Sequence, residues 1–347
     1  FHLAIQTIMV NSSHKIDVHA HFVPSTLIQY VRKGLAPKGI TLDESTPGTS
    51  CLCFDYGLKV RPFFDKLTDL ENRWVEMDRQ GINIQIIQGW TDIFGYQMPV
   101  SSGSAWHRVM NECLLEITNR YPQKLAALVS LPLQNAEQSA KELEYGILQG
   151  NAIGAVVAAN VCGVNLGESD LDPVWETAQQ LNVPIFIHPD QPIPTIRSKN
   201  FRLNAIAHYT YDTTITVGSL IFSGVMDRFP NLKLILAHGG GYFPYQLGRF
   251  DRIYRNKEMP ITSQETPSHY VDRFYYDTLL HNSEALKFLA KIVGYSRILL
   301  GSDYPFPPAD HDPLQSLVNA SFTDSQVEQI GYTNVTQAFS TYNIHKP

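Results

Sequence analysis

Short runs rich in β-branched residues alternate with longer amphipathic stretches along the whole chain, and this alternation limits the fold more than any other feature. Eight strands are predicted, at 15–22, 82–88, 125–131, 153–159, 184–188, 233–238, 274–280 and 297–303. Eight helices are predicted between and after them, near 69–80, 104–121, 135–149, 171–182, 212–228, 243–257, 283–293 and 312–330. In the helix near 212–228 we expect Asp212 at the N-cap and an apolar face of Ile215, Leu220, Ile221 and Val225.

Eight strands, each followed by a helix, are typical of a closed (β/α)₈ TIM barrel of the α/β class. A doubly wound open sheet is the alternative, but no Gly-x-Gly-x-x-Gly pattern follows the first strand. The chain has 347 residues, 44% of them hydrophobic. We therefore expect a single domain over 1–347, in which the stretch 23–68, rich in Pro and Gly, forms a small insertion or lid after the first strand.

Charge and composition argue against several classes of protein. The net charge is −6 and no run of like charge stands out, which argues against a nucleic-acid groove or a polybasic membrane patch. No apolar stretch reaches the roughly 20 residues of a membrane helix, and the apolar start FHLAIQTIMV lacks the basic region of a signal peptide. A cytoplasmic protein with reduced thiols is predicted, because no zinc pair or disulfide framework is formed by Cys51, Cys53, Cys113 and Cys162.

Histidines and one aspartate gather at the carboxyl ends of the predicted strands. His19 and His21 are separated by one residue, so on a strand they point the same way, into the barrel. Such a pair alone is a weak sign of a metal site, since a polar strand end would look the same. His188, His238 and Asp303 end the fifth, sixth and eighth strands. Barrel enzymes build their active sites at this end, and chance does not readily produce this distribution.

Three segments carry a resemblance to a known family. IDVHAHFVP, AHGGGYFPYQLGR at 237–249 and GSDYPFPP at 301–308 resemble the amidohydrolase superfamily, and within it the aminocarboxymuconate-semialdehyde decarboxylase-like branch. Residues 23–60 match this branch only loosely. The resemblance implies that one divalent metal per chain, zinc in preference to manganese, is bound by His19, His21, His188 and Asp303. One metal is expected because the fourth strand, IGAVVAAN, has no bridging lysine.

The resemblance gives His238 the role of general acid/base beside the metal. In one mechanism, His238 activates a metal-bound water that adds to the substrate before carbon dioxide leaves. In the other, His238 or Asp303 protonates the ring carbon directly. The sequence leaves both open. The run 239–241, all glycine, is either a place where a ligand approaches the backbone closely or an ordinary turn from strand to helix.

Arginines are expected to bind the substrate carboxylate. By its position in the resemblance, Arg249 enters the active site of the neighbouring subunit of a homodimer. The alternative is a surface arginine that pairs with Asp251 or Glu258. Arg61, in the insertion, and Arg202, after the fifth strand, are further candidates.

Aromatic and polar residues near the strand ends supply further candidates. Phe306, with Trp90 and Tyr304, could form a wall for a flat substrate, although aromatic side chains are more often core. Asp277 and His281 bracket the end of the seventh strand and are candidates to orient a ligand.

The resemblance implies a metal-dependent, non-oxidative decarboxylase, a carbon–carbon lyase, that acts on a small aromatic, heteroaromatic or conjugated carboxylic acid. The candidate substrates are aminocarboxymuconate semialdehyde, salicylate-type acids such as 6-methylsalicylate and an isoorotate-like ring. The alternatives are a hydrolase of a lactone or amide, a hydratase and a binding protein without catalysis. Decarboxylase is preferred to hydrolase only on the similarity around 237–249.

Overall fold

The computed structural model describes residues 14–46, 49–60, 65–190, 196–256 and 260–340. The predictions made for Arg61 and for the N-terminal segment 1–13 lie outside these residues. Within the described part, no helix is long and apolar enough to cross a membrane.

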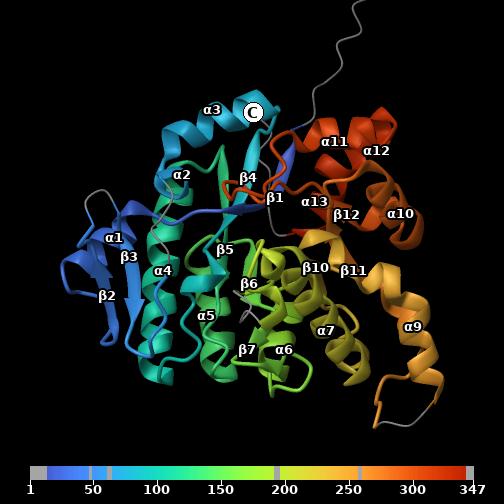
Figure 1. Ribbon diagram of the computed structural model, residues 1–347, viewed down its shortest axis with the longest axis horizontal. Coiled ribbons are helices and arrows are strands. Elements are labelled where there is room, and N and C mark those ends of the chain that lie inside the picture. Colours follow the sequence, from blue (N-terminus) through green and yellow to red (C-terminus); the bar gives the residue numbers. More distant parts are fainter. Residues whose placement is uncertain (1–13, 47–48, 61–64, 191–195, 257–259, 341–347) are drawn as a thin grey trace, which may run out of the picture.

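Eight parallel strands form one sheet at the centre of the molecule, as predicted (Figure 1). In the order of the sheet they are β1 (Ile16–His21), β4 (Ile84–Gln88), β5 (Leu125–Ser130), β6 (Gly154–Ala158), β9 (Pro184–His188), β10 (Lys233–Leu236), β11 (Phe274–Asp277) and β12 (Ile298–Leu299). Backbone hydrogen bonds from Val18 to Leu300 and from Asp303 to His19 join the last strand to the first. The sheet is therefore a barrel, and the fold prediction is confirmed.

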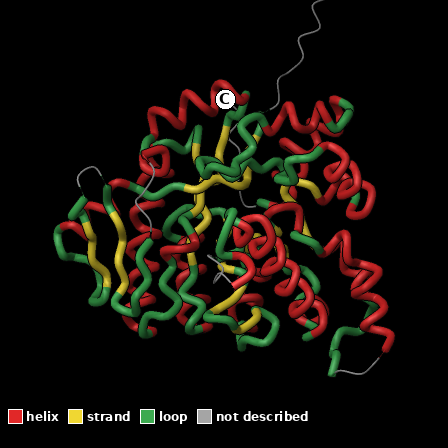
Figure 2. The backbone as a smooth tube through the Cα atoms, viewed as in Figure 1, coloured by secondary structure: helices red, strands yellow, loops and turns green. Residues whose placement is uncertain are grey.

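Helices surround the strands (Figure 2). They are α2 (Asp65–Thr68), α3 (Leu70–Gln80), α4 (Val100–Arg120), α5 (Ala136–Leu148), α6 (Asp172–Gln180), α7 (Tyr209–Phe222), α8 (Val225–Arg228), α9 (Phe243–Asn256), α10 (Ser283–Val293), α11 (Pro313–Asn319), α12 (Asp324–Glu328) and α13 (Asn334–Ala338). Several start where the sequence supplies a capping side chain. Asp69, Asn135 and Asn282 each accept a hydrogen bond from the backbone N–H three residues on, which satisfies a donor that the helix leaves free.

Two predicted helices are wrong in detail. The helix expected over 212–228 begins at Tyr209, directly after a π-helical turn, so Asp212 lies inside it and is not its cap. It ends at Phe222 because Gly224 takes a left-handed φ of 72°, and α8 is separate. Ile215, expected on the apolar face, is 37% exposed. The helix expected over 312–330 is likewise divided, where Ser321 has a φ of 57°.

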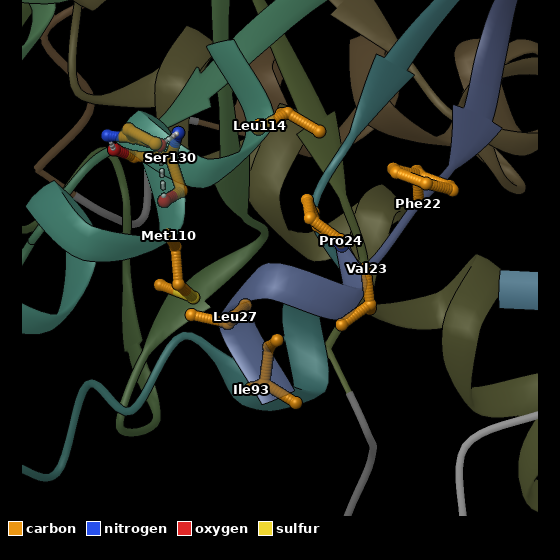
Figure 3. Close-up of a pocket in the computed structure, with 10 residues that line it drawn as sticks. Phe22, Val23, Pro24, Leu27, Ile93, Met110, Leu114 and Ser130 are labelled. Atoms are coloured by element: carbon orange, nitrogen blue, oxygen red, sulfur yellow. Dashed lines mark hydrogen bonds between the residues drawn. The ribbon is translucent and has the colours of Figure 1, made fainter. Parts of the chain in front are cut away.

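The predicted insertion contains α1 (Ser25–Arg32) and an antiparallel hairpin of β2 (Ile40–Asp43) and β3 (Cys51–Phe54), which lies beside α4 (Figure 1). Leu27 of α1 faces Met110 of α4 across a pocket of only about 10 Å³ (Figure 3). A volume this small holds at most one water molecule and cannot hold a substrate. A role of the insertion as a lid stays a prediction.

Candidate metal centre and active site

Four predicted residues meet at the carboxyl end of the barrel. The alternation of β1 turns the His19 and His21 side chains to the same side, and both are fully buried. His188 ends β9, and Asp303 follows β12. One potential ligand atom from each of the four lies within 4.8 Å of the others. The structure thus brings together, from two strands and a loop, the set that the sequence proposed.

Each imidazole is oriented by a hydrogen bond at its Nδ1 atom. The Nδ1 of His19 lies 2.7 Å from Asp277 Oδ2, that of His21 lies 3.3 Å from the Gly89 carbonyl, and that of His188 lies 2.7 Å from the Pro189 carbonyl. Because each partner is an acceptor, Nδ1 carries the hydrogen. All three rings therefore present Nε2 to the same point, as metal-binding histidines do.

The spacing of the converging atoms suits a divalent ion. The Nε2 atoms of His19 and His21 are 3.2 Å apart, and they lie 3.3 and 3.1 Å from Asp303 Oδ1. Ligands about 2.0 Å from a tetrahedral metal are about 3.3 Å apart, which matches these distances. The buried atoms His188 Nε2 and Asp303 Oδ1 form no hydrogen bond with the described residues. Buried polar atoms need a partner, and a metal ion at this point would satisfy both.

Electrostatics at this point also favour a cation. Burial by itself would lower the pKa of His19, but the carboxylates of Asp303 and Asp277 raise it to about 10. Burial would raise the pKa of Asp303, but the neighbouring imidazoles hold it well below its usual range. The two carboxylates thus draw positive charge to the centre, and a divalent ion would supply it.

His238 lies beside the four residues without joining them. Its Nε2 is 3.7 Å from Asp303 Oδ2, and its side chain is 15% exposed whereas His19 and His21 are fully buried. The backbone N–H groups of His238 and Gly239 donate to Asp277 Oδ2 and Oδ1, at 2.9 and 2.8 Å. Asp277 therefore connects the ring of His19 to the backbone that carries His238.

The candidate after that strand, His281, and the glycine run have simpler explanations. His281 is exposed and forms no hydrogen bond with a described residue, so it does not orient a ligand in this structure. The three glycines at 239–241 all have positive φ. A Cβ atom on Gly241 would lie 2.2 Å from the Thr210 carbonyl oxygen. The glycines are thus required for the turn and its packing, which is the plainer of the two interpretations.

A large open cavity of about 1270 Å³ adjoins the cluster. Its lining includes Thr91, Tyr96, Asn160, Asp190, Asp212 and Tyr242, together with Tyr56 and Leu58 from the insertion. None of the four converging residues is in its lining. The cavity comes near them at Thr91, whose hydroxyl lies 3.3 Å from His188 Nδ1. No arginine or lysine of the described residues lines it.

The structure places the predicted substrate-binding residues in different settings. Phe306 is half-buried, and its ring centroid lies 4.8 Å from that of His21 and 5.4 Å from that of Trp90. Tyr304 packs instead under the guanidinium of Arg73, so it belongs to the core.

The two described arginine candidates are on the surface. Arg202 is exposed before the π-helical turn that leads into α7. Arg249 is exposed on α9 and forms no ion pair with Asp251, whose carboxylate faces Arg255 and the Ser268 N–H. Glu258, the other expected partner, lies outside the described residues.

Thr91 is a site residue that the sequence did not single out. Its hydroxyl donates to the Pro189 carbonyl at 3.2 Å and so braces the segment that carries His188. No local pattern could have identified it, because 97 residues separate it from His188 and only the barrel brings the two together.

Known proteins resemble this chain over most of its length. An amidohydrolase family model matches residues 16–339. The chain is 30% identical to a 2-amino-3-carboxymuconate-6-semialdehyde decarboxylase from Dictyostelium discoideum over 87% of its length and 85% of the relative's. It is 28% identical to a gamma-resorcylate decarboxylase from Polaromonas, covering 79% and 88%. A crystal structure of a Polaromonas dihydroxybenzoic acid decarboxylase with bound manganese and 2-nitroresorcinol superposes with a TM-score of 0.74 at 23% identity, covering 94% and 97%.

Proposed function

Because this chain belongs to the amidohydrolase family, we propose that it is a metal-dependent, non-oxidative decarboxylase of a small aromatic, heteroaromatic or conjugated carboxylic acid. The observation that carries this proposal is the convergence of three Nε2 atoms and one carboxylate beside a cavity large enough for such an acid. Relatives named as decarboxylases cover most of the chain, which supports a lyase over a hydrolase.

His19, His21, His188 and Asp303 would hold one divalent ion. Such an ion would bind the carboxylate or hydroxyl oxygens of the substrate and offset the negative charge that develops as carbon dioxide leaves. Zinc is our first choice, since three of the four donors are imidazole nitrogens. Manganese is the alternative, as the structural relative from Polaromonas carries it.

The protein must also supply a proton. When the bond to the carboxyl group breaks, its electron pair stays on the substrate carbon, and a proton must replace the carbon dioxide. His238 is suited to this task because its ring is near Asp303, at 3.7 Å, yet is partly exposed toward the solvent from which the proton is renewed. Phe306, in contact with His21, would pack against the flat face of the substrate.

A cation for the remaining negative charge would come from a neighbouring subunit. The cavity has no described arginine or lysine in its lining, whereas Arg249 is exposed on α9 and has no described ion-pair partner. Tyr245 and Ile253 on the same helix are each 44% exposed, and apolar side chains of this kind suit a protein–protein contact. The proposed active form is therefore a homodimer in which Arg249 of one subunit enters the active site of the other. Arg61 and Arg202 remain further candidates.

Isotope labelling tests the reaction. A panel of hydroxybenzoic acids and conjugated semialdehyde acids is incubated with the metal-loaded protein in deuterium oxide. A decarboxylase releases carbon dioxide and places one deuterium on the carbon that carried the carboxyl group. Solvent oxygen in a ring-opened product, with no carbon dioxide, would instead identify the lactone or amide hydrolase and refute the proposal.

A further inference from the structure

A buried carboxylate two residues before His19 ties three parts of the barrel together. Asp17 is fully buried on β1. Its Oδ1 accepts the backbone N–H groups of His19 and Ser302, both at 3.0 Å. Its Oδ2 accepts the Ser302 hydroxyl at 2.5 Å and the Gln85 side-chain amide at 3.0 Å. One side chain thus connects β1, β4 and the residue directly before Asp303.

A buried guanidinium continues this network on the other side of Gln85. Arg73 of α3 is fully buried between the rings of Phe22 and Tyr304. Its NH1 donates to Gln85 Oε1 at 2.7 Å and its NH2 donates to the His21 carbonyl at 2.6 Å. Burying a charged group is costly unless polar partners offset it. Here Gln85 bridges the positive guanidinium of Arg73 to the negative carboxylate of Asp17. The guanidinium also contacts the peptide carbonyl of His21.

The order of donors and acceptors gives the Gln85 amide a single orientation. Arg73 can only donate and the Asp17 carboxylate can only accept. The carbonyl of Gln85 must therefore face Arg73 and its NH₂ group must face Asp17, as observed. If the amide were reversed, its NH₂ group would face the donors of Arg73 and its carbonyl oxygen would face the carboxylate of Asp17.

We propose that Asp17, Gln85 and Arg73 are positioning residues for the metal centre, which set the spacing of His19, His21 and Asp303 through their peptide groups. The contacts end on the His19 N–H, the His21 carbonyl and the N–H of Ser302, next to Asp303. The converging atoms they place are only 3.1 to 3.3 Å apart. Metal–ligand distances vary by about 0.2 Å, so a small shift of one peptide lowers metal affinity. This inference rests on the metal role proposed for the four ligands.

The test is the dissociation constant for Zn²⁺, measured by competition with a chromophoric chelator. Asp17→Asn keeps the size of the side chain but replaces an acceptor with a donor that opposes Gln85. We expect the affinity to fall about 10- to 100-fold, as for other residues that orient metal ligands. The visible spectrum of the Co²⁺-loaded variant should also shift, because it reports the ligand geometry.

A matched control and a double variant separate positioning from general stability. Asp78→Asn makes the same change at the exposed Asp78–Lys124 ion pair and should leave the Zn²⁺ affinity unchanged. In Arg73→Met, Gln85 no longer faces the guanidinium and is free to turn its carbonyl toward the amide that Asp17→Asn introduces. The double variant of Asp17→Asn and Arg73→Met should therefore bind Zn²⁺ more tightly than the product of the two single losses predicts.

Three outcomes would overturn the inference. The first is a folded Asp17→Asn protein with the Zn²⁺ affinity and Co²⁺ spectrum of the wild type. The second is a double variant whose loss of Zn²⁺ affinity equals the product of the two single losses. The third is a loss of Zn²⁺ affinity in Asp78→Asn as large as that in Asp17→Asn. If Asp17→Asn does not fold, Ser302→Ala removes one hydrogen bond from the same carboxylate. It should weaken Zn²⁺ binding at least about threefold, and an unchanged affinity would refute the inference. Failure of the wild-type protein to bind any metal would instead refute the proposed function.

Discussion

Replacing His238 by asparagine separates an acid/base role from metal binding. Asn is the appropriate replacement because His238 has a φ of 55°, and Asn occupies this left-handed region more readily than most residues. The hydrogen bond from residue 238 to Asp277 is retained, since the donor is the backbone N–H. His238 also lies outside the four residues whose ligand atoms converge. We therefore expect the variant to fold and to keep its metal.

The expected loss is in turnover. Asn cannot exchange a proton near neutral pH, so the general acid/base contribution of His238 is removed. That contribution is typically about 10²- to 10⁴-fold in rate, which corresponds to about 2.7 to 5.4 kcal/mol of transition-state stabilisation. The change should appear in kcat. The substrate KM should change little, because His238 is not assigned to the carboxylate or ring of the bound substrate.

Carbon dioxide release and metal content are measured on the same samples of His238→Asn and of a control. His281→Asn is well matched, since His281 also has a left-handed φ, of 54°, but is exposed. The control should keep activity within about twofold. Loss of metal from His238→Asn would identify His238 as a ligand. Metal retained with activity within about tenfold of wild type would refute its role as acid/base.

Three further predictions concern other parts of the structure. The Asp277 carboxylate accepts hydrogen bonds from four groups, the His19 ring and three backbone N–H groups. In Asp277→Asn the new amide NH₂ opposes some of these donors, so metal affinity measured by chelator competition should fall about 10- to 100-fold. An unchanged affinity would contradict the orienting role of Asp277. Burial lowers the pKa of His107 to about 3, whereas in the unfolded chain it is about 6.5. Below about pH 6.5 the unfolded chain therefore binds a proton that the folded protein does not, and the free energy of unfolding falls with pH. Urea unfolding at pH 7.5 and 5.5 should show a wild-type loss about 1.4 kcal/mol larger than that of His107→Asn, and equal losses would refute it. Inactive Arg249→Ala and Asp303→Asn chains, refolded together in equal amounts, should recover about a quarter of wild-type activity if Arg249 acts across a dimer, and no recovery in confirmed mixed dimers would place it elsewhere.

Local pattern is sufficient to predict the strands and the common direction of His19 and His21. All eight strands lie where short runs rich in β-branched residues predict them, because parallel strands covered on both faces are mostly apolar. The side-chain period of two on β1 also placed His19 and His21 together without reference to the rest of the chain. Assigning the ligands and His238 their roles depended on the family resemblance.

The supporting contacts could not be predicted in this way. Asp17 and Ser302 are 285 residues apart and Thr91 and His188 are 97 apart, so only closure of the barrel brings them together. The ends of helices are less predictable from sequence than the strands, because they depend on single backbone torsions. Gly224 ends α7 through its positive φ, and the π-helical turn before Tyr209 has no simple period in the sequence.

We propose that decarboxylation requires one divalent ion held by His19, His21, His188 and Asp303. Elemental analysis of the purified protein, paired with carbon dioxide release before and after treatment with a strong chelator, tests this requirement. We expect about one zinc or manganese ion per chain, loss of activity on chelation and recovery when that ion is returned. His188→Ala and Asp303→Ala should retain little metal, because each removes one of the four ligands. A fully active wild-type protein that contains no transition metal would contradict it.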